Sequence, residues 1–442
     1  MTSYWCGYAW LPVGLAAGVR IEVVGDRIVG VWPGVEALPG DVRLAGVTLP
    51  GLANAHSHAF HRALRGRTHG DGGTFWTWRE RMYAVASRLD PPRYLALARA
   101  AYAEMALAGY TAVGEFHYVH HQPDGTPYAD PNAMGQALIQ AAADAGVRLT
   151  LLDTIYLTGG LGPDGHLPLD AVQQRFSDGT VRAWSARVGL RNDAPAARMG
   201  AAIHSVRAVP KEALAGVVLA SAGRPLHVHL SEQPAENATC RAYYGVTPTA
   251  LLEDAGALGP ATTVVHATHL TAEDISSLAR TNTTACFCPT TERDLADGIG
   301  PARALADAGS PLALGSDQHA VVDPFEEARG LESHERLVTL ERGRFTPAQL
   351  VEVLCRNGYA ALGWPDGGRL APGALADFVT VRLDSPRTAG AAPEQVLYAA
   401  TGADVTTVVV GGELVVSGGA HRLGDVGRLL TDAISALDLE GA

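Results

Sequence analysis

Two histidines, His56 and His58, stand one residue apart at the end of an apolar stretch that begins near Pro50. Side chains on a β-strand alternate between its two faces, so both imidazoles project from the same face. Two imidazoles side by side at the end of a strand can chelate one divalent metal ion. A single pair of this kind also fits two ordinary core or surface histidines, so its interpretation depends on the rest of the chain.

Three further side chains able to bind a metal, His229, His266 and Asp317, each end a different apolar stretch of strand-like sequence. Three imidazoles and one carboxylate are a plausible ligand set for Zn²⁺, with water completing the coordination. A bound Zn²⁺ lowers the pKa of that water to about 7 and so supplies hydroxide at neutral pH. Each residue alone could be a simple hydrogen-bonding group, but their occurrence at separate strand ends favours a metal site. The predicted ligands are His56, His58, His229 and Asp317.

Other histidines and cysteines near these positions are predicted to have structural roles. His227 shares a strand face with His229 but stands two residues earlier, so we expect it to be hydrogen-bonded lower in the fold. Cys286 and Cys288 form a Cys-x-Cys pair that could bind metal, but their neighbours are typical of a strand, which favours core packing.

The order of elements along the chain predicts the framework that positions these residues. Apolar stretches typical of strands alternate with stretches whose apolar spacing is typical of helices. The predicted strands are 49–56, 111–119, 148–156, 200–208, 225–232, 262–270, 282–290 and 311–318, and the predicted helices are 92–108, 132–146, 168–187, 209–222, 247–256, 271–280, 301–309 and 347–362. Eight strand–helix repeats are typical of an α/β fold, the (β/α)8 TIM barrel, whose active site lies at the carboxyl ends of the strands.

Both flanks of the predicted barrel are rich in short β-like segments, so we expect a small β-sandwich domain built from both chain ends. The predicted domain limits are 1–48 for its N-terminal part, 49–365 for the barrel, 366–430 for its C-terminal part and 431–442 for a terminal helix or tail. Segment 65–74 contains a Gly- and Asp-rich run and is a candidate mobile loop.

Composition excludes several classes of partner. The formal charge is −12, which disfavours nucleic acid and anionic membranes as partners. Five scattered cysteines are typical of reduced thiols and favour a cytoplasmic location. The first residues do not resemble a signal peptide, and the sequence contains no run of 18 apolar residues that could span a membrane.

The strand-end pattern resembles that of the amidohydrolase superfamily: a His-x-His pair, a strand-five His, a strand-six His and a strand-eight Asp. Segment 368–378 also resembles the superfamily's split β-sandwich, and the resemblance covers nearly the whole chain. One subgroup binds two metals through a carboxylated lysine on strand four, whereas the sole lysine here, Lys211, lies beyond that strand. We therefore expect one divalent ion, most plausibly Zn²⁺, with iron or manganese as alternatives.

The resemblance also implies catalytic roles. Single-metal relatives with His-Leu-Ser-Glu after strand five are mostly deaminases, in which Glu232 would shuttle protons to the substrate nitrogen. His266 would act as general base or orient the water, and Asp317 would bind the metal and accept a proton.

A narrower resemblance concerns the substrate. Segments 75–80, 115–121 and 204–207 together are similar to the branch of the superfamily that hydrolyses N-formimino-L-glutamate to N-formyl-L-glutamate and ammonia in histidine degradation. Such a substrate carries two carboxylates, which arginine can bind in a bidentate manner. The predicted substrate-binding residues are Arg79, Tyr118, His204 and Arg207.

Several assignments stay open. His61 stands where the family often has Gln, His120 and His121 are expected more often to be solvated than functional, and His269 is expected to be structural. The resemblance also implies a homodimer. The first alternative function is deamination of a purine, pterin or triazine-like ring, and a more distant one is a non-catalytic barrel that binds a partner.

Overall fold

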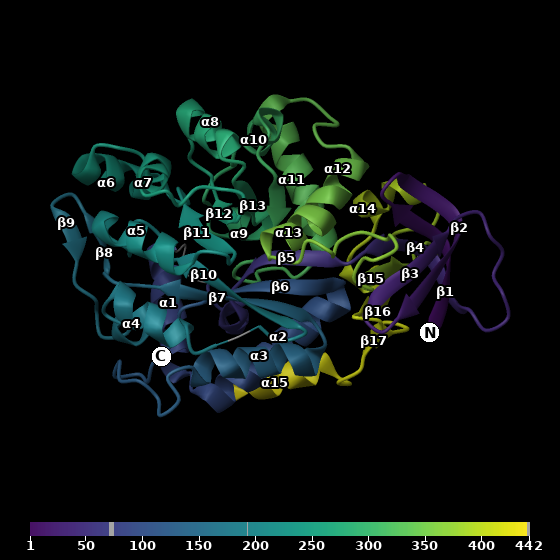
Figure 1. Cartoon of the computed structure of the whole chain (residues 1–442), viewed down its shortest axis with the longest axis horizontal. Helices are drawn as coiled ribbons and strands as arrows, with labels where there is room; N and C mark the ends of the chain where they lie inside the picture. Colours follow the sequence, from purple (N-terminus) through teal and green to yellow (C-terminus); the bar gives the residue numbers. More distant parts are fainter. Residues whose placement is uncertain (70–74, 192, 440–442) are drawn as a thin grey trace.

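A computed structural model describes residues 1–69, 75–191 and 193–439, without the side chains of residues 75 and 76. Its centre is a parallel sheet of eight strands curled into a nearly closed barrel (Figure 1). In barrel order the strands are β5 (Leu52–Ser57), β6 (Tyr110–His117), β7 (Arg148–Ile155), β10 (Ala197–Ile203), β11 (Leu226–Leu230), β12 (Thr262–His266), β13 (Thr284–Phe287) and β14 (Leu312–Leu314). A parallel bridge between Ser57 and Asp317 brings the first and last strands together, so the predicted (β/α)8 barrel is confirmed.

Helices surround the barrel and follow its strands. They are α1 (Phe75–Arg88), α2 (Pro91–Ala108), α3 (Ala133–Ala145), α4 (Val181–Val188), α5 (Lys211–Ala220), α6 (Pro234–Tyr244), α7 (Pro248–Asp254), α8 (Ala272–Arg280), α9 (Pro289–Asp294), α10 (Ala302–Ala308), α11 (Pro324–Thr339), α12 (Pro347–Glu352) and α13 (Gly358–Ala361), with a π-helical turn Val353–Asn357 between the last two and 3-10 turns at Ala59–Leu64 and Gln173–Phe176. A hairpin of β8 (Gly160–Gly162) and β9 (Gly165–Leu167) follows β7.

The two ends of the chain form a second, mixed sheet of eight strands, as the sequence predicted for the flanks. Its order is β18 (Ala420–His421), β17 (Glu413–Ser417), β16 (Val405–Val410), β15 (Phe378–Val381), β4 (Val42–Pro50), β1 (Thr2–Leu11), β2 (Gly14–Val24) and β3 (Arg27–Trp32). The N-terminal and C-terminal halves meet where β4 pairs with β15 in antiparallel register. Short helices α14 (Val396–Ala399), Pro393–Gln395 and Gly402–Asp404 precede β16.

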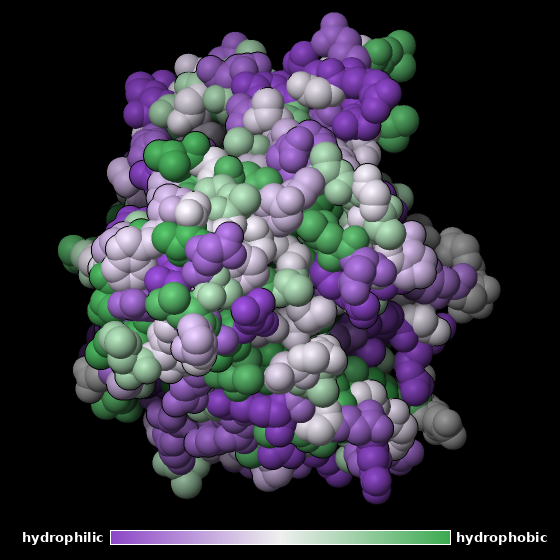
Figure 2. Space-filling model, turned by 90° about the vertical axis from the view of Figure 1, so that its right-hand side faces the viewer, coloured by the Kyte–Doolittle hydropathy of each residue, from purple (hydrophilic) through white to green (hydrophobic). Residues whose placement is uncertain are grey.

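The last helix, α15 (Val426–Ser435), leaves this sheet and packs along α2 on the outside of the barrel (Figure 1). Figure 2 views the end of the molecule that carries the terminal sheet, where hydrophobic and hydrophilic residues are interspersed. In the described ranges, no helix combines the length and the apolar character needed to cross a bilayer.

Some predicted elements differ from the structure. The predicted helix 168–187 is two short helical segments, because Gly179 adopts φ +74° and Thr180 caps a new helix with its hydroxyl. Residues 49 and 50 of the first predicted strand belong to β4, and Gly51 separates them from β5. Helices α6 and α11 and the hairpin β8–β9 were not predicted, and α15 begins five residues before the predicted terminal segment 431–442.

Candidate metal centre and active site

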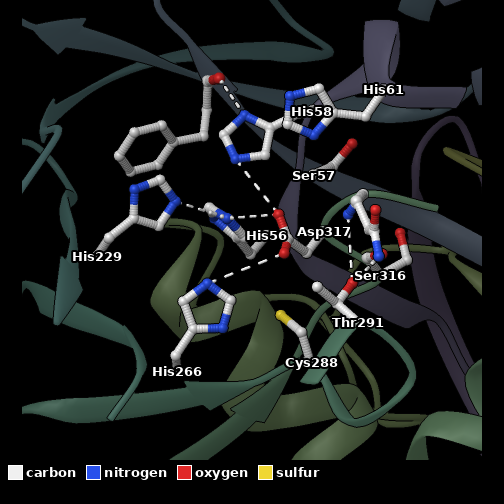
Figure 3. A network of polar contacts seen from close by, with 12 residues as sticks. His56, Ser57, His58, His61, His229, His266, Cys288, Thr291, Ser316 and Asp317 are labelled. Atoms are coloured by element: carbon white, nitrogen blue, oxygen red, sulfur yellow. Dashed lines mark hydrogen bonds and ion pairs between the residues drawn. The ribbon is translucent and has the colours of Figure 1, made fainter. Parts of the chain in front are cut away.

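The carboxyl ends of the barrel strands bring the predicted ligands into one cluster (Figure 3). His56 Nε2 lies 3.1 Å from His229 Nε2 and 3.3 Å from Asp317 Oδ1. His58 Nε2 lies 3.4 Å from the same oxygen of Asp317. All four side chains are buried, so the cluster can hold an ion away from bulk water.

Backbone carbonyls fix the orientation of two of these imidazoles. His58 Nδ1 lies 2.9 Å from the Phe116 carbonyl oxygen, and His229 Nδ1 lies 2.9 Å from that of His204. A carbonyl only accepts hydrogen bonds, so each Nδ1 carries the proton and each Nε2 presents a lone pair to the cluster. A lone pair of His58 thus faces an oxygen of Asp317, an arrangement that a cation between them stabilises. The donor set therefore fits a divalent metal ion.

The ionisation of the cluster agrees with this arrangement. Burial is the main cause that lowers the pKa of His58 to about 3, so its imidazole is neutral, as a metal ligand must be. Burial opposes ionisation of Asp317, but hydrogen bonding to His56 and the neighbouring imidazoles outweigh it and lower the pKa of the carboxyl. The site therefore presents neutral imidazoles and one carboxylate.

His266, from the end of β12, lies among three carboxylates. Its Nε2 is 3.7 Å from Glu232 Oε1 and 3.9 Å from Asp317 Oδ2, and its Nδ1 is 3.5 Å from Glu292 Oε1. Burial alone would lower the pKa of His266, but the negative charges of these carboxylates raise it well above its usual value. His266 is therefore placed to donate hydrogen bonds at the centre of the site.

Strained and closely packed backbone supports the cluster at two places. His266 and Asp317 adopt φ of +71° and +43°, a left-handed region that costs energy for residues other than glycine. At Gly315, a Cβ atom would lie 2.8 Å from both Cβ and the carbonyl oxygen of His56. Only glycine lets the end of β14 approach β5 this closely, and that approach places Asp317 beside the His-x-His pair.

A cavity of about 190 Å³ opens from the cluster, and it contains all four predicted substrate-binding residues. Arg79, Tyr118, His204 and Arg207 line it together with Glu232. Aromatic side chains complete its wall, and the hairpin β8–β9 contributes Leu161 and Leu167; the aromatic residues are Trp78, Tyr83, Tyr118, Tyr156 and Phe176. The structure thus brings the predicted residues to one small cavity, and their contacts with a substrate stay a prediction.

Arg207 reaches this cavity between two carboxylates. Its Nη2 donates to Glu232 Oε2 at 3.2 Å, and its Nε lies 3.3 Å from Glu236 Oε2. Arg79 also lines the cavity, and its guanidinium lies 5.5 Å from the ring centroid of Tyr83. The two guanidinium groups therefore line the same cavity as Glu232 and His266.

Several histidines left open by the sequence have defined partners. His61 is buried in the cavity wall, where its Nε2 lies 3.0 Å from the hydroxyl of Tyr118. His269 Nε2 donates to the carbonyl of Asp297, which fits the expected structural role. His227 Nε2 donates to the carbonyl of Ala361, as predicted. Cys286 and Cys288 are buried in an apolar cluster with Ala55, Val265 and Ala313, which agrees with core packing.

The prediction that His120 and His121 are solvated is wrong, because both are buried. His120 Nε2 donates to the Thr154 carbonyl at 2.8 Å, and His121 Nε2 lies 3.2 Å from Asp178 Oδ1. His117, His120 and Asp153 are close enough to hold an ion, but Arg187 binds both oxygens of Asp153 at 2.8 Å. This second cluster is therefore a buried polar network that already has its cation.

Three buried acidic residues of the site were not predicted. Glu236 contacts Arg207, Glu292 contacts His266, and Glu115 accepts hydrogen bonds from Ser57 Oγ and the backbone N–H of Ala59. A glutamate is most often solvated, so its residue type gives no signal of burial. Glu232 precedes α6, which begins at Pro234, so its spacing from Glu236 gives no signal either.

Comparison with known proteins agrees with the fold. A formimidoylglutamate deiminase from Pseudomonas aeruginosa is 37% identical over 439 residues, covering 95% of this chain and 96% of that protein. The crystal structure of an amidohydrolase from Brucella melitensis is 33% identical, with a TM-score of 0.91 over 99% of this chain and 100% of that one. An adenosine deaminase from Xanthomonas campestris with bound zinc shares the fold, at 23% identity and a TM-score of 0.85 over 100% and 99% of the two chains.

The family model that matches this chain describes the amidohydrolase family and covers residues 47–415. This span contains the whole barrel and the metal cluster, together with the β4–β15 junction between the two sheets. The chain therefore belongs to the amidohydrolase family.

Proposed function

We propose that this protein hydrolyses N-formimino-L-glutamate to N-formyl-L-glutamate and ammonia, with one zinc ion held by His56, His58, His229 and Asp317. The observation that carries the proposal is the cavity in which Arg79 and Arg207 lie beside this cluster and Glu232. Two guanidinium groups suit a substrate with two carboxylates, and Glu232 suits its cationic formimino group. The 37% identical deiminase supports the same substrate.

The residues divide the reaction among them. The ion, when bound, lowers the pKa of water to about 7 and so makes a nucleophile available at neutral pH. His266 orients the attacking water. Glu232, whose Oε1 is 3.7 Å from His266 Nε2, takes a proton from this water. The water oxygen bonds to the formimino carbon, the bond from this carbon to the terminal nitrogen breaks, and the nitrogen leaves as ammonia with the proton from Glu232. Asp317 accepts the remaining hydroxyl proton as the carbonyl of the N-formyl group forms.

Substrate orientation is assigned to the cavity wall. Arg79 and Arg207 each bind a carboxylate, and Tyr118 and His204 add directional hydrogen bonds. A ring substrate such as a purine would need a flat apolar slot and would offer no carboxylate to either guanidinium group. The homodimer and the cytoplasmic location stay predictions.

The experiment is to incubate the purified, zinc-loaded protein with N-formimino-L-glutamate and to measure ammonia, N-formylglutamate, formamide and glutamate. Ammonia with N-formylglutamate supports the proposal. Formamide with glutamate would show that the other C–N bond breaks, and the role given to Glu232 would be wrong. If the zinc-loaded protein turns over a purine and leaves N-formimino-L-glutamate unchanged, the ring-deaminase alternative replaces the proposal.

A further inference from the structure

One guanidinium, that of Arg207, holds the proposed proton carrier Glu232 and the buried Glu236 at the same time. The Nη2 end contacts Glu232 at 3.2 Å, and the Nε side lies 3.3 Å from Glu236. We propose that Glu236 is a positioning residue: it anchors Arg207 while the Nη2 end moves from Glu232 to a substrate carboxylate, which frees Glu232 for proton transfer. This inference rests on the proposed function, because the incoming carboxylate belongs to the proposed substrate.

Glu236 has the surroundings of a fixed anchor. It lies in the first turn of α6, where the helix dipole favours a negative charge, and its side chain is fully buried. Its Oε1 accepts the backbone N–H of Ser231 at 3.1 Å, and its Oε2 faces Arg207. One oxygen therefore holds the carboxylate to the end of β11, and the other is committed to the guanidinium.

Glu232 has the surroundings of the partner that can be exchanged. Unlike Glu236, it lines the cavity, and so does Arg207, so a ligand in the cavity reaches both residues. A substrate carboxylate presents two oxygens to the guanidinium and can replace the single Nη2 contact at 3.2 Å. While Arg207 holds Oε2 of Glu232, the carboxylate is fixed in one orientation and offers only Oε1, 3.7 Å from His266 Nε2, to the reacting atoms, so the exchange links substrate binding to catalysis.

This link predicts an effect on kcat as well as on KM. A contact that only binds substrate raises KM when it is lost, whereas a contact that frees a catalytic group also lowers kcat. The first test uses the unaltered, zinc-loaded enzyme with two analogues. N-formimino-4-aminobutyrate lacks the α-carboxylate, and N-formimino-L-2-aminobutyrate lacks the γ-carboxylate. We expect one of them to lower kcat at least about 10-fold. If both analogues only raise KM, the inference is wrong.

The second test is Glu236→Gln, which keeps an oxygen for the N–H of Ser231 and removes the charge opposite Arg207. Arg207 then stays with Glu232, and we expect kcat for N-formimino-L-glutamate to fall on the order of 10- to 100-fold. With the kcat-sensitive analogue, Glu236→Gln should lower kcat little further, because Arg207 already stays with Glu232. Glu236→Asp keeps the charge and should recover part of kcat.

The matched control is Glu332→Gln on α11. Glu332 is also fully buried and paired with an arginine, Arg336, at 2.8 Å, but it does not line the cavity. It should keep kcat and KM for all three compounds, with metal content and melting temperature measured alongside. If Glu236→Gln behaves like this control, or lowers kcat equally for substrate and analogue, the inference is wrong and the proposed function stands. If the unaltered enzyme releases no ammonia from N-formimino-L-glutamate, the proposed function itself fails, and the inference with it.

Discussion

His58 and His229 show how much of the site depends on single hydrogen bonds. Each gives its Nδ1 proton to a backbone carbonyl, of Phe116 and His204 respectively, and so keeps Nε2 for the metal. The sequence predicted these ligands from strand-end spacing, but it gave no sign of their carbonyl partners, since any residue type supplies a carbonyl. The same holds for the buried acids Glu236 and Glu292, which tertiary contacts alone bring to the site.

Glu115 leads to a prediction of pH dependence. Burial is the main cause that raises its pKa from 4.5 to about 8 in the folded protein, so the native state keeps a proton that the unfolded chain loses. The stability from this group is complete below about pH 4.5 and is lost as pH rises through about 8, by up to about 1.4 kcal/mol per pH unit.

Glu115→Gln removes this titration and can keep the hydrogen bonds to Ala59 N–H and Ser57 Oγ. We expect the unfolding free energy of the variant, relative to the unaltered protein, to increase steadily between pH 5.5 and 7.5 in urea titrations at equal metal content. Glu413→Gln makes the same change at a side chain that is 77% exposed and controls for the loss of one acidic group. A difference that stays constant with pH would contradict the prediction.

At the scale of elements, the barrel strands were the most predictable part of the fold. Their apolar runs identify them, and the polar residues that end them identify the site. Helix α11 was missed because its buried face mixes the apolar Phe325, Ala328 and Leu331 with acidic residues. Glu327, Glu332 and Glu335 interrupt the apolar periodicity that identifies a helix. Predicted helix 168–187 was wrong for a local reason. The first helical segment ends at Phe176, Gly179 adopts φ +74°, and Thr180 caps a new helix.

Gly315 gives a prediction at this scale. A methyl group there would lie 2.8 Å from backbone and Cβ atoms of His56, so Gly315→Ala must push β14 away from β5. We expect lower zinc content by elemental analysis and a fall in kcat/KM on the order of 100-fold, because Asp317 would no longer match the histidines. Gly259→Ala, where a methyl group meets nothing within 4 Å, is the control and should keep both quantities. Normal zinc content in Gly315→Ala would show that the strands can separate without harm.

At the scale of the whole molecule, a buried ion pair joins the barrel to the terminal sheet, and its two residues lie 229 positions apart in the sequence. Arg148, at the start of β7, donates through Nε and Nη2 to Asp377, at 2.6 and 3.1 Å, just before β15. Asp377 also accepts the N–H of Gly411 and the hydroxyl of Tyr359. Because Arg148 begins its strand, the pair lies at the opposite end of the barrel from the metal cluster.

Because the pair lies far from the metal cluster, we expect its loss to lower the stability of the fold with little effect on catalysis. Arg148→Met leaves a buried carboxylate without its cation, so we expect the unfolding free energy to fall by about 3–5 kcal/mol, while kcat of the folded enzyme changes less than about twofold. Asp377→Asn should be similarly destabilising, and the double variant should lose less than the sum of the two, because neither charge is then left alone. Arg356→Met, which breaks a pair with Glu352 whose side chains are 67% and 51% exposed, should cost less than about 1 kcal/mol. A large loss of kcat in folded Arg148→Met would instead show that the junction with the terminal sheet holds the geometry of the metal cluster at the far end of the strands.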